Sequence, residues 1–186
     1  MDEKAGKPQG GLSAPRIRSV FLIGFMGAGK TSVGRALGQR SGWEFVDLDD
    51  CIQAREGRTI EQIFEQSGEE GFREVEHVCL ETLLSDSNAP PRIVALGGGA
   101  YVQPGNAELL ARPGVTVICL DAPVEELFRR CQQEPVIRPL RGELQQFREL
   151  YDMRRPAYAR ANLLFDTNGK TIEAVAEEIA QRLDLS

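Results

Sequence analysis

Short apolar runs alternate with amphipathic stretches from residue 19 to the end of the chain. Five of these runs have the length and the β-branched content of buried strands. The expected strands are 19–23, 44–48, 92–96, 115–120 and 162–166. Because strands that alternate with helices form parallel sheets covered on both faces, the pattern predicts an α/β fold with a five-stranded parallel sheet.

Apolar positions three or four residues apart predict helices between these strands. The expected helices span about 30–41, 50–85, 104–112, 123–131, 143–160 and 172–183. The stretch before the third strand contains a capping box at 59–62 and a glycine at 68 that is expected to end a short helix. Two or three helices therefore lie where a crossover needs only one, which predicts an inserted substrate-binding subdomain.

Two segments lack any hydrophobic period. Residues 1–17 are polar and rich in glycine and proline, and we expect them to form a disordered tail. Residues 132–142 contain two prolines, Gly142 and two arginines, and we expect a mobile loop. Residues 18–186 then form a single domain, a size that can bury a good core.

The segment after the first expected strand carries the most specific motif. Residues 24–31 fit G-x-x-x-x-G-K-[ST], the phosphate-binding loop, with a strand before it and a helical pattern after it. Glycines let backbone N–H groups approach a triphosphate, and the helix presents its positive end. Lys30 is expected to reach the β- and γ-phosphates of ATP, and the Thr31 hydroxyl to bind Mg²⁺. The expected ATP-binding residues here are Gly24, Gly27, Ala28, Gly29, Lys30, Thr31 and Ser32.

Charge and composition argue against several other functions. The net charge of −6 argues against bulk nucleic-acid binding. No apolar stretch reaches the length of a membrane span, and the N-terminus lacks a signal-peptide core. His77 is the only histidine and the four cysteines form no C-x-x-C pair, so a zinc site or a Cys/His nucleophile has little to build on. Unclustered cysteines are typical of reduced thiols, so we expect a cytoplasmic protein.

Asp47 and Asp49 stand at the carboxyl end of the second expected strand. Sites in open α/β sheets lie beyond the carboxyl ends of the strands. One acid is expected to hold Mg²⁺ through water, and the other to orient and deprotonate a hydroxyl nucleophile. The alternative is that both are ordinary turn and helix-capping acids. Their side chains share a direction only if the strand stays regular.

Gly97, Gly98 and Gly99 follow the third expected strand, where a Walker B aspartate often stands. Since no aspartate is there, Asp47 is the best candidate for the second contact to Mg²⁺. Three glycines expose N–H groups that suit a small polar ligand, although a flexible turn is an equally weighted alternative.

Three arginines, Arg73, Arg138 and Arg154, come from separate parts of the chain. A guanidinium suits two-pronged binding of a carboxylate or phosphate. Any single arginine is more often a solvated surface residue. Arg138 is the best candidate because it lies in the proline-bounded loop, from which a lid would carry it onto the transferring phosphate.

Taken together, these residues resemble the shikimate kinase family of P-loop enzymes, which is related to the nucleoside monophosphate kinases. The motifs are G-F-M-G-A-G-K-T at 24–31, D-x-D at 47–49, G-E-x-x-F-R-x-x-E at 68–76, G-G-G at 97–99, R-P-L at 138–140 and R-R-P-x-Y at 154–158. The resemblance implies a three-layer P-loop kinase fold with strand order 2-3-1-4-5. It also implies a substrate-binding subdomain at about 49–78 and a lid at about 131–142.

The resemblance further implies the roles of single residues. Asp49 would bind the shikimate hydroxyls and act as the base, Arg73 and Arg154 would bind the carboxylate, and Arg138 would face both substrate and γ-phosphate. The triple glycine would contact the substrate.

Two further residues are implied on the nucleotide side. Arg130 would stack on the adenine of ATP, and Asn168 would contribute to adenine contacts.

The implied reaction is ATP + shikimate → ADP + 3-phosphoshikimate, in the biosynthesis of chorismate and the aromatic amino acids, with Mg²⁺ as cofactor. The catalytic residues would be Lys30, Asp49 and Arg138. We expect a monomer that acts on a small molecule and binds neither nucleic acid nor membrane. The alternatives are another small-molecule kinase, of the gluconate type, and a non-catalytic nucleotide-binding regulator, which would lack an intact Asp49, Arg138 or lid.

Overall fold

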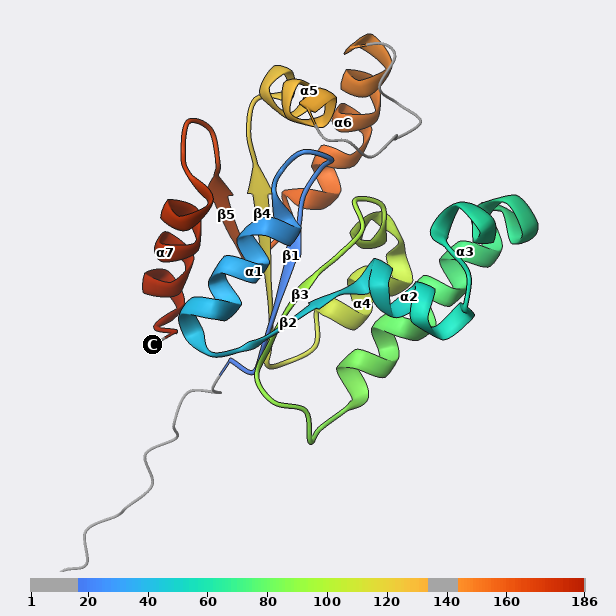
Figure 1. The fold of residues 1–186 in the computed structure, drawn as a ribbon, viewed down its shortest axis with the longest axis horizontal. Coiled ribbons are helices and arrows are strands. Elements are labelled where there is room, and N and C mark those ends of the chain that lie inside the picture. The colour runs from blue at the N-terminus through green and yellow to red at the C-terminus, as the bar shows by residue number, and fades with distance from the viewer. Residues whose placement is uncertain (1–16, 134–143, 186) are drawn as a thin grey trace, which may run out of the picture.

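The computed structural model describes residues 17–133 and 144–185. Five parallel strands form one sheet in the order β2-β3-β1-β4-β5, so the predicted fold class and strand order are confirmed (Figure 1). The strands are β1 Ser19–Ile23, β2 Glu44–Asp47, β3 Arg92–Ala95, β4 Val115–Asp121 and β5 Leu163–Asp166. The predicted tail, except for Ile17, and most of the predicted lid, including Arg138, lie outside the described residues.

The central strands explain why their sequences are continuous apolar runs. Phe21 of β1 lies beside Val94 of β3 and Val117 of β4, and all three side chains are buried. The edge strands β2 and β5 are only partly buried and are accordingly more polar. Helices on both faces of the sheet leave the inner strands no solvent-facing side.

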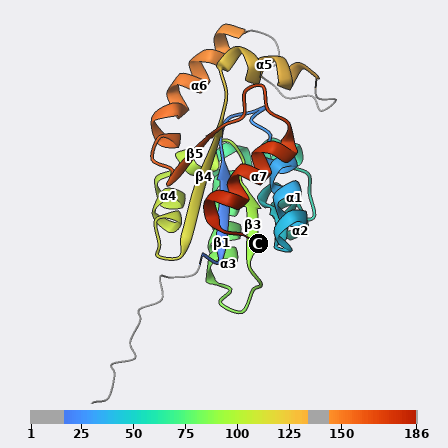
Figure 2. The ribbon, with the colours of Figure 1, turned by 90° about the vertical axis from the view of Figure 1, so that its left-hand side faces the viewer.

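The helices form two outer layers. They are α1 Lys30–Ser41, α2 Leu48–Glu56, α3 Ile60–Ser85, the short 3₁₀ helix η1 Ala100–Val102, α4 Pro104–Leu110, α5 Val124–Gln133, α6 Leu144–Tyr158 and α7 Ile172–Leu183. Helices α1 and α7 pack together on one face of the sheet, and α4 lies on the other face with the lower part of α6 (Figure 2). Helix α5 and the upper part of α6 stand above the carboxyl end of the sheet (Figure 1).

The region between β2 and β3 differs in detail from the prediction. Strand β2 ends at Asp47 rather than at residue 48, because the Asp47 side chain caps α2, which begins at Leu48. The predicted capping box at Thr59 is present. Gly68 breaks the helical backbone with φ 68° and ψ −174°, so the short helix ends there as predicted. A longer helix follows directly, and the two together are labelled α3. In Figure 1, α2 and the first part of α3 project to one side of the sheet.

Over the two described stretches of chain, no helix combines the length and the apolar character that a membrane crossing requires.

Candidate active site

The phosphate-binding loop joins the carboxyl end of β1 to α1, and its backbone requires glycine. Gly24 has a φ of 141° and Gly27 a φ of 78°, conformations that residues with a Cβ rarely adopt. A Cβ at Gly24 would lie 2.2 Å from the carbonyl oxygen of Leu120, and one at Gly27 would lie 2.5 Å from that of Leu127. The loop therefore packs directly on the backbone of β4 and α5, which fixes its path.

Lys30, the first residue of α1, lies over this loop. Its Nζ donates hydrogen bonds to the carbonyl oxygens of Gly24 and Phe25 at 2.9 and 3.1 Å. Gly29 precedes the helix and provides no side-chain cap. The first N–H groups of a helix have no partner within it, and they carry partial positive charge. The loop and Lys30 thus form a site for an anionic phosphate group.

Thr31 and Asp47 meet beside the loop. The Thr31 hydroxyl donates to Oδ2 of Asp47 at 2.9 Å, and Oδ1 of Asp47 accepts from the backbone N–H of Asp49 at 3.1 Å. A hydroxyl and a carboxylate are oxygen ligands of the kind that Mg²⁺ prefers. No group of three or more His, Cys, Asp or Glu side chains with metal-ligand placement occurs among the described residues. The oxygen donors of this pair therefore fit Mg²⁺.

A cavity of about 590 Å³ extends from the phosphate-binding loop to the end of β3. Because β3 lies between β1 and β2, the carboxyl ends of all three strands open into the same space. Its lining includes the predicted residues Lys30, Thr31, Asp47, Asp49, Gly97, Gly98 and Arg154. The structure thus brings a phosphate-binding lysine and a carboxylate together in one chamber.

Arg73 of α3 does not line this chamber but a separate cavity of about 460 Å³, and it is held by two acids. Its Nη1 donates to both carboxylate oxygens of Glu76 at 3.1 and 3.0 Å, and Glu69 accepts from its other nitrogens. The Glu76 side chain is fully buried. Burial raises the pKa of Glu76, and Asp49 adds to the rise, while Arg73 and Arg154 oppose it. Glu76 was part of a motif in the sequence, but only its burial against Arg73 marks it as a site residue.

The triple glycine packs against the two predicted carboxylate-binding arginines. A Cβ at Gly99 would lie 2.6 Å from Nη2 of Arg73, and one at Gly98 would lie 3.3 Å from Nη1 of Arg154. The Tyr158 hydroxyl donates to the carbonyl oxygen of Gly98 at 2.5 Å. Arg73 and Arg154 therefore flank this loop, and a side chain at Gly99 would displace the Arg73 guanidinium.

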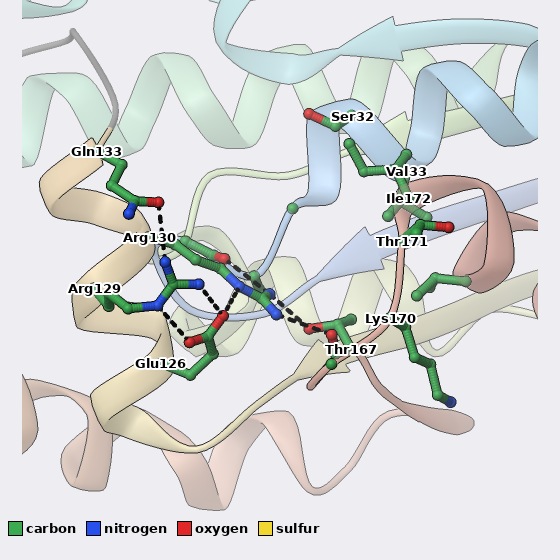
Figure 3. Close-up of a pocket in the computed structure, with 15 residues that line it drawn as sticks. Ser32, Val33, Glu126, Arg129, Arg130, Gln133, Thr167, Lys170, Thr171 and Ile172 are labelled. Atoms are coloured by element: carbon green, nitrogen blue, oxygen red, sulfur yellow. Dashed lines mark hydrogen bonds and ion pairs between the residues drawn. The ribbon is translucent and has the colours of Figure 1, made fainter.

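A second pocket, of about 560 Å³, lies on the other side of the phosphate-binding loop (Figure 3). Arg130 is its best-anchored side chain. It donates to the hydroxyl and the carbonyl oxygen of Thr167, both at 2.9 Å, and to Glu126 at 2.8 Å. Arg129 contacts the same Glu126, but its side chain is 57% exposed against 23% for Arg130. The guanidinium of Arg130 therefore presents the more fixed plane in this pocket.

Three of the four cysteines are poor nucleophiles. None of the four forms a disulfide bond. Burial raises the pKa of the Cys119 thiol to about 12, and it raises the pKa values of Cys51 and Cys79 as well. Protonated thiols neither attack substrates nor bind metals.

Comparison with known proteins places the chain in a family. The family model for shikimate kinase matches residues 26–184. The chain belongs to the shikimate kinase family. A curated shikimate kinase from Geobacter metallireducens is 42% identical over 177 residues, covering 93% of this chain and 96% of that protein. One from Persephonella marina is 36% identical over 170 residues, covering 90% and 99%.

Solved structures agree with this assignment. The shikimate kinase from Acinetobacter baumannii, in complex with shikimate, superposes with a TM-score of 0.80 at 36% identity, covering 91% of this chain and 94% of that one. A gluconokinase from Sinorhizobium meliloti reaches a TM-score of 0.58 at 18% identity, which shows a shared fold alone. The expected shikimate kinase family is therefore confirmed over the gluconate-type alternative.

The roles predicted for the single site residues of this shikimate kinase family member all stay predictions, including those of Asn168 and Arg138. Asn168 does not line the second pocket, where its neighbours Thr167 and Gly169 do. Its backbone N–H donates to Asp166 at 2.8 Å. The sequence motif gave no signal for Thr167, which becomes visible only through its contacts with Arg130. Arg138 is outside the described residues.

Proposed function

We propose that the protein transfers the γ-phosphoryl group of ATP to the 3-hydroxyl of shikimate, giving ADP and 3-phosphoshikimate in chorismate biosynthesis. The observation that carries the proposal is the single chamber in which Lys30, Asp49 and Arg154 converge beside the triple glycine. A phosphate site, a carboxylate for the hydroxyl and a cation for the substrate carboxylate are the three parts that this reaction needs.

The phosphate-binding loop would hold the nucleotide. Lys30 and the N-terminus of α1 would neutralise charge on the β- and γ-phosphates. The second pocket, which Arg130 lines, would take the adenine. Thr31 and Asp47 would hold Mg²⁺, which would offset the negative charge of the phosphates when bound. Support for this assignment is their hydrogen bond of 2.9 Å next to Lys30.

The acid and the arginines would hold shikimate. Asp49 would accept the proton of the attacking hydroxyl, since its carboxylate faces the chamber close to Gly97. Arg73 and Arg154 would bind the substrate carboxylate from either side of the triple glycine. Asp49 and Arg73 both belong to the proposed subdomain at about 49–78. Arg138 remains a prediction for the transferring phosphate.

We further propose a cytoplasmic monomer without nucleic-acid or membrane partners. Its net charge of −6 disfavours nucleic acid, and cysteines that form no disulfide bond with one another are typical of a reducing compartment. Sedimentation velocity across a hundredfold range of protein concentration tests the monomer.

A coupled ADP-release assay tests the reaction. Shikimate, quinate, gluconate and nucleoside monophosphates are compared as acceptors for the wild-type protein. We expect ADP release with shikimate to exceed that with each other acceptor, and phosphorus NMR to detect 3-phosphoshikimate. A higher specificity constant for gluconate or for a nucleotide would overturn the proposal.

Asp49→Asn tests the base. The amide cannot accept the hydroxyl proton, so we expect kcat to fall about 10²–10⁴-fold while ATP affinity stays close to that of the wild type. Titration with a fluorescent ATP analogue measures affinity separately from turnover. Turnover within about twofold of the wild type would remove Asp49 as the base.

A further inference from the structure

Arg154 is held in place by neighbours from two different elements. It lies on α6, with Nη1 3.3 Å from the position of a Cβ at Gly98. The arginine side chain is long and flexible. It loses rotamer freedom whenever its guanidinium holds a carboxylate in one geometry. Contacts that fix this side chain before the substrate arrives therefore lower the cost of binding.

Tyr158 provides the first of these contacts. It lies one helical turn after Arg154 on α6, so the two side chains share a face. Its hydroxyl donates to the Gly98 carbonyl oxygen at 2.5 Å. A Cβ at Gly98 would lie 3.7 Å from this hydroxyl and 3.3 Å from Nη1 of Arg154, so the two side chains meet beside Gly98. The ring is 4% exposed, and burial raises the pKa of Tyr158, so the hydroxyl keeps its proton for Gly98.

Phe25 provides the second contact, and it belongs to the phosphate-binding loop. The Arg154 guanidinium carbon lies 5.7 Å from the centre of the Phe25 ring, within the range of a cation–π interaction. The ring is fully buried and is clamped edge-to-face by Phe147 at 4.9 Å and Tyr151 at 5.5 Å. Such a clamped ring gives the guanidinium a rigid surface to lie on.

We propose that Tyr158 and Phe25 are positioning residues that fix Arg154 for the carboxylate of the acceptor. Tyr158 would hold Arg154 beside the triple-glycine loop. The Phe25 ring would hold the Arg154 guanidinium beside the phosphate-binding loop. The geometry of the carboxylate site thus depends on the phosphate-binding loop. This inference rests on the proposed function, because it assumes that Arg154 meets the carboxylate of shikimate.

The test compares shikimate with its uncharged methyl ester. The ratio of kcat/KM for the two acceptors measures how much the enzyme gains from the carboxylate. In Tyr158→Phe, which keeps the buried ring, we expect this ratio to fall about tenfold, with KM for ATP unchanged. Phe25→Leu, which removes the ring but stays apolar, is expected to lower the ratio in the same direction.

Tyr151→Phe is the matched control. Tyr151 is also a buried tyrosine of α6 that packs on Phe25, but its hydroxyl donates to Asp121 rather than contacting Arg154. Its variant should keep the wild-type ratio. Thermal melts of all three variants establish that each one folds.

The outcomes separate the two proposals. Wild-type activity on shikimate with an unchanged ratio in both Tyr158→Phe and Phe25→Leu would overturn the positioning role alone. A wild-type protein that is inactive on shikimate would overturn the proposed function, and with it this inference. If the ratio falls equally in Tyr151→Phe, the positioning role is also overturned. Loss of any buried tyrosine hydroxyl on α6 would then lower the ratio, without a specific contact to Arg154.

Discussion

At the residue scale, the Asp47 carboxylate accepts two hydrogen bonds, one with each oxygen. One oxygen caps α2 through the Asp49 N–H, and the other accepts from Thr31. The cap fixes where α2 starts, so it also sets where the Asp49 carboxylate enters the chamber. We therefore propose two roles for this residue, which are holding Mg²⁺ and positioning the base.

Removing the Thr31 hydroxyl should change the metal requirement. In Thr31→Val, which keeps the shape of the side chain, we expect a higher Mg²⁺ concentration for half-maximal activity, because one ligand oxygen is lost. Asp47→Asn should act in the same direction. Titrating Mg²⁺ at saturating ATP and shikimate measures this. Thr31→Ser keeps the hydroxyl and is the control that should resemble the wild type. Identical Mg²⁺ curves for Thr31→Val and Thr31→Ser would contradict the metal assignment.

At the scale of elements, α3 carries a buried acid into the site. Glu76 lies one turn after Arg73 on this helix, and both of its oxygens accept from Arg73. Burying a charged carboxylate costs free energy because the group loses its hydration. The two hydrogen bonds from Arg73 offset part of this cost. Burial of Glu76 therefore lowers the free energy of unfolding, while its hydrogen bonds hold Arg73 in one position.

The pH dependence of stability should reveal this cost. Because the pKa of Glu76 is raised above 4.5 in the folded protein, the folded state keeps the proton after the unfolded chain has lost it. This contribution to the free energy of unfolding is complete below pH 4.5 and is lost as the pH rises through the folded pKa. The wild type should therefore lose stability relative to Glu76→Gln over that window, by at most about 1.4 kcal/mol per pH unit. Urea unfolding from pH 4 to 8 measures the difference.

Glu69→Gln provides the control, since Glu69 contacts the same Arg73 with a side chain that is 70% exposed. Its free energy of unfolding should run parallel to that of the wild type over this pH range. A wild-type curve that instead gains stability relative to Glu76→Gln with rising pH would show that Arg73 outweighs burial.

At the scale of the whole molecule, the strand order decides which parts of the chain meet. Residues 24–31, 47–49 and 97–99 are far apart in the sequence, yet they follow the adjacent strands β1, β2 and β3. Helix α6 then brings Arg154 to the same end of the sheet. The site is therefore a property of the assembled sheet, and ligands that bind it should stabilise the entire domain.

Ligand-dependent melting tests this coupling. A ligand present at about a hundredfold excess over its Kd should add about 2.7 kcal/mol to the free energy of unfolding. We expect Mg²⁺–ATP and shikimate each to raise Tm of the wild type. Lys30→Ala should lose most of the shift from ATP but keep that from shikimate, because only the phosphate contact is removed. An unchanged ATP shift in Lys30→Ala would contradict the role of this lysine.

The sequence by itself determined the parts whose chemistry is local. Residues 24–31 form a phosphate-binding loop because glycine spacing and a following helix are short-range properties. The five apolar runs became five strands for the same reason, since their burial on both faces requires continuous hydrophobicity. The family motifs further supplied the strand order. The ends of elements were less exact, as at β2, where a side-chain cap overrode an apolar residue at position 48.

Only the tertiary structure decided how distant side chains support one another. Nothing local to Glu76 says that it is buried against Arg73, and nothing local to Phe25 says that Arg154 lies over its ring. The bond from Tyr158 to Gly98 spans 60 residues. Likewise, Thr167 is recognised only through Arg130. These contacts depend on which helices pack above the sheet, and that packing is a sum of many weak interactions that no short stretch of sequence contains.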